Sequence, residues 1–205
     1  MKKFSFKNHI QNNFKWYFLG IIVAFVVSLL SITIAAAPTK KEKIAILLTC
    51  YSTDSSLSKY MESIKPDYLE TIELNVRHKE DTYYGTVIKG YRNNADVLIV
   101  PESKIDYIIL KNCLVLNNDF VNELTTSDFD YYTKDDVNYG LKIYSKDTKK
   151  GLLDGLVIYN KEDNDEDCYL FININSYHLG KYNDSKYDGL ISILKEILNY
   201  EKENS

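Results

Sequence analysis

One long uncharged segment near the start of the chain constrains its architecture more than any other feature. Residues 17–37 read YFLGIIVAFVVSLLSITIAAA, which is 21 consecutive positions without a charged side chain. A helix rises about 1.5 Å per residue, so this segment matches the roughly 30 Å hydrocarbon core of a bilayer. It has no polar face of the kind that an amphipathic helix of a soluble core carries. The sequence therefore predicts a transmembrane helix over residues 17–37.

The residues that flank this segment leave two interpretations open. Trp16 and Tyr17 suit a membrane interface, and Pro38 stops the helix. An uncleaved signal-anchor is favoured because the apolar run is longer than the about 7–15 residues of a signal-peptide core. A cleaved signal peptide is the alternative, with the alanines at 35–37 as its cleavage site. A lipoprotein signal is excluded because Cys50, the first cysteine, lies thirteen residues beyond the run.

Charge predicts the orientation of the helix. The first 16 residues carry four lysines and no acidic residue, whereas the whole chain has a net charge of −4. The part after residue 37 therefore has a net charge of −8, because four of the 25 basic residues lie before it. Short lysine-rich tails stay in the cytoplasm, and long domains cross largely regardless of charge. We expect a single-pass protein of the cell membrane with a cytoplasmic basic tail (1–16), a transmembrane helix (17–37), a tether (38–42) and an extracytoplasmic domain (43–205).

The first half of the outer domain alternates strand and helix patterns. Short apolar or alternating segments predict strands over residues 43–49, 71–77 and 96–100. Helical spacing predicts helices between and after them, over residues 54–64, 79–91 and 101–111. This order of elements predicts a mainly parallel sheet with helices on its faces, which is a three-layer α/β domain.

The second half has a different pattern. A short strand over 113–116 and a polar, helical or irregular segment over 117–136 come first, and further strands are expected over 138–144, 155–159 and 168–174. Residues 187–200 predict an amphipathic helix with a core stripe made of Leu190, Ile193, Leu194, Ile197 and Leu198.

The acidic loop over residues 162–167 invites comparison with a calcium-binding loop. Its aspartates alternate like the first ligands of such a loop, but Cys168 and Ile174 stand where Gly and Glu are needed. A solvated turn is therefore expected, with weak surface calcium binding as the alternative.

The three cysteines, Cys50, Cys113 and Cys168, form no C-x-x-C motif and no Cys/His cluster, so no metal site is expected. They are interpreted as small buried side chains. The alternative outside the cell is one disulfide and one free thiol, with the pairing left open.

No catalytic motif is present. The chain has no nucleophile elbow, zinc-protease motif or phosphate-binding loop. Ser176 and His178 lie two residues apart, but a triad is assembled in space, and His178 is expected to be an ordinary loop residue. Glu102 and Asp106 are expected to serve the start of a helix. We therefore expect no enzyme and no cofactor, and the acidic outer domain gives no nucleic-acid signal.

One part of the chain can be compared with a known family. The segments KIAILLTCYS, TIELNVRHKEDTYYGTVIKGYRNNADVLIVPESKID and LVLNNDF, within residues 43–120, resemble extracellular solute-binding proteins of bacterial ABC importers. They look like the N-terminal lobe of the type II periplasmic-binding fold, as in its sugar-binding members. The matching pieces are residues 72–76, 83–84, 95–100 and 114–117. The resemblance implies a small polar ligand such as a sugar and an ABC permease as partner.

Length limits what this resemblance implies. Full members of that family are roughly twice as long and close two lobes around a ligand, whereas residues 38–205 suffice for one lobe. A single open face buries less of a ligand, so weak affinity is expected. The alternative is an interaction or accessory protein that keeps the lobe fold, binds no ligand and docks on a membrane or envelope complex.

The expected ligand site lies beyond the carboxyl ends of the strands, where open α/β sheets bind ligands. The residues that the sequence places there, or on the neighbouring helix, are Tyr51, Ser52, Thr53, Asp54, Tyr83, Tyr84, Pro101, Glu102 and Ser103. Hydroxyl groups, a helix N-terminus and tyrosine rings suit a sugar or another small polar ligand. The alternative is that the Ser, Thr and Asp side chains only cap helices.

Overall fold

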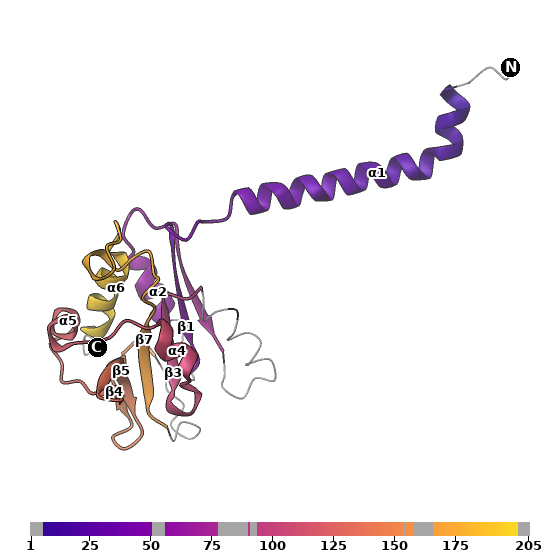
Figure 1. The fold of residues 1–205 in the computed structure, drawn as a ribbon. Coiled ribbons are helices and arrows are strands. Elements are labelled where there is room, and N and C mark those ends of the chain that lie inside the picture. Colours follow the sequence, from indigo (N-terminus) through magenta and orange to yellow (C-terminus); the bar gives the residue numbers. More distant parts are fainter. Residues whose placement is uncertain are drawn as a thin grey trace. The chain divides into compact units, whose positions relative to one another are not determined.

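The computed structural model describes residues 6–50, 56–77, 90, 94–153, 155–157 and 166–200 (Figure 1). The chain divides into two compact units, Met1–Pro38 and Thr39–Ser205.

The first unit contains one long helix, α1, over Phe6–Ala35. Its segment Asn13–Ile34 is long and apolar enough to cross a membrane, and none of it is buried. A signal sequence near an N-terminus has the same properties. The hydroxyl groups of Ser31 and Thr33 donate to the carbonyls of Val27 and Leu29 at 2.8 and 2.9 Å. The helix therefore satisfies these polar groups internally, as a bilayer interior requires.

The second unit is built on one sheet. Its strands are β1 (Lys43–Leu48), β2 (Thr71–Val76), β3 (Val97–Pro101), β4 (Tyr131–Lys134), β5 (Val137–Ser145), β6 (Lys150–Gly151) and β7 (Cys168–Ile172). Their order in the sheet is β2-β1-β3-β7-β5-β4, with β6 paired to β5. Strand β1 is parallel to both β2 and β3, and the remaining pairs are antiparallel.

The sheet is therefore mixed, and the prediction of a mainly parallel sheet holds only for its first three strands. The turn between β4 and β5 accounts for one of the antiparallel pairs. Asp135 and Asp136 have φ of 51° and 59°, and Lys134 pairs with Val137 across them. A two-residue loop with two positive φ angles forms a tight hairpin, and hairpins join antiparallel strands. In the polar segment over 117–136, expected to be helical or irregular, Asn118–Leu124 does form a helix, α5, but Tyr131–Lys134 forms strand β4.

Helices cover both faces of the sheet, as Figure 1 shows. Helices α2 (Ser56–Ser63), α5 (Asn118–Leu124) and α6 (Gly189–Leu198) pack on the larger core, and α4 (Tyr107–Asn112) packs on the smaller one. Within β1, Ile46 faces the first core and Leu47 faces the second, because successive strand residues point to opposite faces. The prediction of an α/β domain is thereby confirmed, and in the described residues helices lie on both faces of its one sheet.

Helix α6 shows the agreement between sequence and structure most clearly. All five residues of its predicted core stripe are buried, at 2% exposure or less. Burying each such side chain contributes about 1.5–3 kcal/mol, which is why this pattern is a strong signal in the sequence.

Two other predicted elements differ from those in the structure. The helix expected over 101–111 is a short 3-10 turn, η1 (Glu102–Lys104), followed by α4, because Asp106 starts a new helix. Its Oδ1 accepts hydrogen bonds from the backbone N–H groups of Ile108 and Ile109, both at 3.0 Å. The strand expected over 113–116 is reduced to one bridge, from Cys113 to Asn173.

The strand expected over 155–159 is wrong in its described part. Residues 155–157 form a turn, in which the N–H groups of Leu156 and Val157 both donate to the carbonyl of Leu153. The helix expected over 79–91 lies outside the described residues, apart from residue 90.

Candidate functional site

The predicted ligand site lies where strands β1 and β3 end, and the structure describes part of it. Six of its nine residues lie outside the described residues: Tyr51, Ser52, Thr53, Asp54, Tyr83 and Tyr84. The other three follow each other at the end of β3. Pro101 is buried, whereas Glu102 and Ser103 begin η1 and are exposed. We call this end of the sheet the carboxyl edge.

The backbone donors of η1 are already used at the carboxyl edge. The N–H of Glu102 donates to the carbonyl of Asp167 at 2.9 Å. The N–H of Ser103 donates to Oε2 of Glu166 at 2.8 Å. The sequence suggested that a helix N-terminus here would receive a polar ligand, but the end of the acidic loop holds these two donors. A ligand at this edge would meet the side chains of Glu102 and Ser103, or would displace Glu166.

Asp167 anchors the end of the acidic loop in the domain and is only 8% exposed. Its carboxylate accepts hydrogen bonds from the N–H of Lys146 and from Nζ of Lys142, both at 2.9 Å. Burial opposes ionisation, but these two hydrogen bonds and the positive charges of Lys142 and Lys146 together lower the pKa of Asp167. In return, the hydrogen bond that Lys142 donates to Asp167 raises the pKa of Lys142. The expectation of a solvated turn is therefore wrong for this residue.

A disulfide joins Cys50 and Cys168 at the same edge, with Cα atoms 6.8 Å apart and both side chains buried. Cys50 follows β1, and Cys168 begins β7 opposite Pro101. Cys113 is free, and burial raises its pKa to about 12. The expectation of a small buried side chain is thus right for Cys113. For the other two cysteines the disulfide, which was the alternative, is what the structure shows.

A hollow of about 350 Å³ adjoins this region, between β5, β6 and the segment before β4. Its lining includes Asp130, Lys142, Tyr144 and Lys150. Because Lys142 also pairs with Asp167, the hollow and the carboxyl edge share a charged side chain. Pockets for small ligands usually have volumes of about 300–1,000 Å³.

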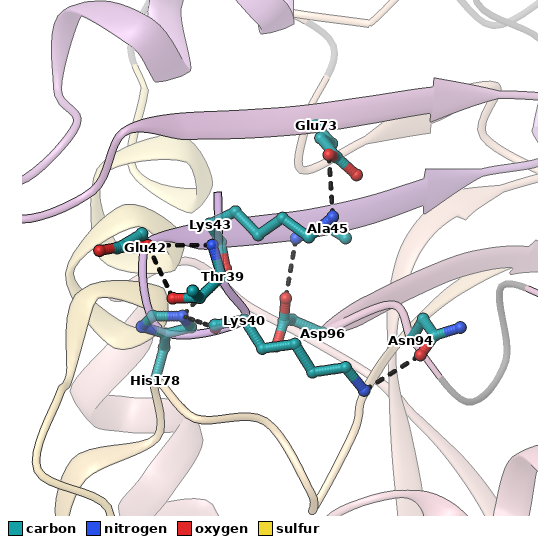
Figure 2. Close-up of polar contacts among 9 residues, drawn as sticks. All are labelled: Thr39, Lys40, Glu42, Lys43, Ala45, Glu73, Asn94, Asp96 and His178. Atoms are coloured by element: carbon teal, nitrogen blue, oxygen red, sulfur yellow. Dashed lines mark hydrogen bonds and ion pairs between the residues drawn. The ribbon is translucent and has the colours of Figure 1, made fainter. Parts of the chain in front are cut away.

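A second polar cluster, which the sequence did not indicate, lies at the opposite end of the sheet, where β1 and β3 begin (Figure 2). We call this end the amino edge. Oδ2 of Asp96 accepts a hydrogen bond from the N–H of Ala45 at 2.8 Å. Burial raises the pKa of Asp96, and hydrogen bonds from Ser176 and Ala45 act against that increase.

His178 is the centre of this cluster and is completely buried. Its Nε2 lies 3.0 Å from the carbonyl oxygens of both Lys40 and Lys43, so Nε2 carries a proton and donates it. Its Nδ1 lies 3.2 Å from the hydroxyl of Tyr68, which itself accepts a hydrogen bond from the N–H of Gly189. His178 is therefore not an ordinary loop residue. It connects the segment before β1 to the loops before β2 and α6.

Hydrogen bonds connect the predicted tether, residues 38–42, to this cluster. Thr39 donates to Oε2 of Glu42 through its N–H and its hydroxyl, at 2.9 and 2.7 Å, and these bonds lower the pKa of Glu42. Nζ of Lys40 donates to Oδ1 of Asn94 at 3.0 Å, as Figure 2 shows. Residues 39–42 thus form a closed turn that belongs to the outer unit. The cavity beside it measures about 30 Å³, which suits one water molecule rather than a ligand.

The residues that the sequence missed share a common property: their partners are distant in the chain. His178 bonds to Lys40 across 138 positions, and the two cysteines lie 118 positions apart. Among these residues, only Asp96 had a local sequence pattern that could have indicated its position, since it immediately precedes an apolar strand. Comparison with known proteins finds no match, either to a family model, to a curated protein or to a solved structure.

Proposed function

We propose that this chain is a membrane-anchored extracytoplasmic binding module. In this proposal α1 is an uncleaved signal-anchor, residues 1–16 are cytoplasmic, and the unit that begins at Thr39 lies outside the membrane. The observation that carries the proposal is the buried disulfide between Cys50 and Cys168. Disulfides form and persist in oxidising compartments and are rare in the cytoplasm. An apolar helix near the N-terminus supplies the route to such a compartment.

The ligand in this proposal is a small polar molecule such as a sugar, bound at the carboxyl edge and delivered to an ABC permease. The disulfide holds the ends of β1 and β7 together beside Glu102 and Ser103. A surface that is held in place before binding loses less conformational entropy when a ligand arrives. The hollow beside Lys142 adds polar surface of suitable size.

Protease added to intact cells tests the location. The outer unit is expected to be degraded, while an epitope tag at the N-terminus stays protected. Alkylation without reductant, followed by reduction and a second alkylating label, is expected to show Cys50 and Cys168 oxidised and Cys113 reduced. An outer unit that resists protease until the cells are lysed would contradict the proposal.

Thermal unfolding of the detergent-solubilised chain tests the ligand. A ligand present at about 100 times its dissociation constant stabilises a protein by about 2.7 kcal/mol, which raises its melting temperature. A panel of sugars, amino acids and short peptides is expected to contain one such compound. The double variant Glu102→Ala/Ser103→Ala should lose this shift. Tyr107→Ala, at an exposed position just beyond η1, should retain it.

The second candidate is an interaction or accessory protein that binds no small ligand. The observation that favours it is that Glu166 and Asp167 occupy the backbone donors of Ser103 and Glu102. Here the domain would dock on a permease or on another membrane protein. Crosslinking in intact membranes is expected to recover one specific membrane protein, and recovery of none would count against this candidate.

A further inference from the structure

We propose that the amino edge of the outer unit contacts the lipid headgroups of the membrane that holds α1. The contact surface consists of Lys40, Lys41, Ile174 and Tyr177. This inference rests on the proposed membrane anchoring, and it does not depend on whether the carboxyl edge binds a ligand.

The length of chain between the apolar segment and the amino edge is the first argument. The candidate span ends at Ile34, and the N–H groups of Ala36 and Ala37 still donate to the carbonyls of Ile32 and Ile34. Helical rise over these residues adds about 5 Å, and the next two residues add at most about 7 Å. Thr39 therefore lies within about 12 Å of the hydrocarbon boundary, and the headgroup layer itself is about 5–7 Å thick.

The turn that begins at Thr39 does not act as a spacer, which is the second argument. Its Lys40 carbonyl accepts from the buried ring of His178, and its Lys40 side chain reaches Asn94. The rest of the amino edge therefore stays close to the point where the chain enters the unit.

The loop that carries His178 presents apolar side chains at this edge. Within it, Asn173, Ser176 and His178 are buried, whereas Ile174 and Tyr177 are 41% and 45% exposed. The N–H of His178 donates to the hydroxyl of Ser176, and the side-chain amide of Asn173 donates to the carbonyl of Ala95. Buried polar contacts thus hold the loop in place while an isoleucine and a tyrosine face outward.

One of these two exposed residues, Tyr177, shares a small hollow with the tether. Lys40 and Tyr177 both line the 30 Å³ cavity beside Asp96. Tyrosine rings and lysine side chains suit a headgroup layer, since both combine an apolar body with a polar end. Glu42, the acid in the same turn, is engaged by Thr39. Exposed Asp184 lies in the next loop, so we expect contact with zwitterionic as well as anionic headgroups.

The aromatic residues beside the membrane helix support the same conclusion. Trp16 and Tyr17 stand at the start of the apolar segment, but residues 29–43 at its other end contain no aromatic residue. Membrane helices usually have aromatic side chains at both interfaces. Tyr177 would supply this aromatic contact from a distant part of the sequence.

Fluorescence quenching in nanodiscs tests the proposal. The single tryptophan is first removed as Trp16→Phe, and one new tryptophan is introduced as Tyr177→Trp in the full chain. The discs contain phosphatidylcholine and a lipid with a nitroxide on its headgroup. The matched control is Asp147→Trp, at an exposed position in the turn between β5 and β6.

Position 147 is a suitable control because the neighbouring Lys146 donates its N–H to Asp167 at the carboxyl edge, at 2.9 Å. A strand of about six residues spans roughly 20 Å, which separates the two edges by more than the headgroup layer. We expect at least about twofold stronger quenching at position 177 than at position 147. Ile174→Trp should behave like Tyr177→Trp, so the result does not depend on one variant folding.

The outcomes separate this inference from the function proposed above. Co-elution with the discs and stronger quenching at 174 and 177 support the membrane contact. Co-elution with equal or absent quenching at all three positions overturns the contact and leaves membrane anchoring intact. Elution without the discs overturns both.

Discussion

At the scale of single residues, Asp96 shows how a half-buried carboxyl group can organise an edge of a sheet. Its backbone N–H donates to the carbonyl of Ala45 at 2.7 Å, and its carboxylate accepts from the N–H of the same residue at 2.8 Å. The same carboxylate also bonds to Ser176. One residue thus connects the start of β3, the start of β1 and the loop that carries His178.

Substitution of Asp96 tests this role. Asp96→Ala leaves the N–H of Ala45 and the hydroxyl of Ser176 without their partner, which is expected to cost about 2–3 kcal/mol of unfolding free energy. Urea unfolding followed by circular dichroism measures the loss. The exposed neighbour Asn94→Ala is the control and should change stability by less than about 1 kcal/mol. Equal effects of the two substitutions would contradict the role of Asp96.

The ion pairs of Glu123 predict that the unfolding free energy of the outer unit depends on pH. It lies on α5 and bonds to Lys181 and Lys195 at 2.8 and 2.9 Å and to the hydroxyl of Tyr182. The hydrogen bond from Lys181, followed by those from Tyr182 and Lys195, lowers the pKa of Glu123 to about 2. Its stabilising effect is therefore present above the unfolded pKa of about 4.3 and is lost as the pH falls towards 2.

Glu123→Gln is expected to lower the unfolding free energy at neutral pH by about 1 kcal/mol, a modest value because the side chain is partly exposed. The difference from wild type should shrink steadily when unfolding is measured from pH 5 down to about pH 2. Glu196→Gln, at an exposed position on α6, should show no comparable loss at neutral pH. A difference that stays constant over this pH range would refute the ion-pair explanation.

At the scale of elements, the disulfide reinforces strand pairing that the sheet already makes. It joins the end of β1 to the start of β7, and β3 lies between these strands in the sheet. The 118-residue separation means that it closes a long loop in the unfolded chain. Such a closure raises the free energy of the unfolded state, so the folded unit gains stability.

Removing the disulfide tests its contribution. The double variant Cys50→Ala/Cys168→Ala is expected to lose about 2–5 kcal/mol of unfolding free energy. Dithiothreitol should lower the denaturation midpoint of the wild type towards that of the variant and leave the variant unchanged. A wild type that does not respond to reductant would show that the bond contributes nothing.

At the scale of the whole molecule, the core residues of the outer unit all lie after Pro38, so this unit should fold without α1. The stability of such a truncated unit depends on its first residue, however, because His178 donates to the carbonyl of Lys40. A chain that begins at Thr39 keeps this acceptor, whereas a chain that begins at Lys43 loses it.

Two truncated chains test this boundary. The chain from Thr39 is expected to unfold at the same denaturant concentration as the outer unit of the full protein. The chain from Lys43 should be less stable by about 1–3 kcal/mol, since it lacks one buried hydrogen bond and the closed turn. If both chains are equally stable, the turn is a simple tether after all.

The sequence by itself determined the apolar helix, the parallel strands β1 to β3, the helix α6 and the position of Pro101, Glu102 and Ser103 at the carboxyl edge. Each of these follows from local periodicity or from a short run of residues. The tertiary structure alone decided the disulfide, the position of His178, the antiparallel half of the sheet and the use of Ser103's N–H by Glu166. These features pair residues that are mostly distant in the chain, and such pairing depends on strand order and register, which local patterns do not encode.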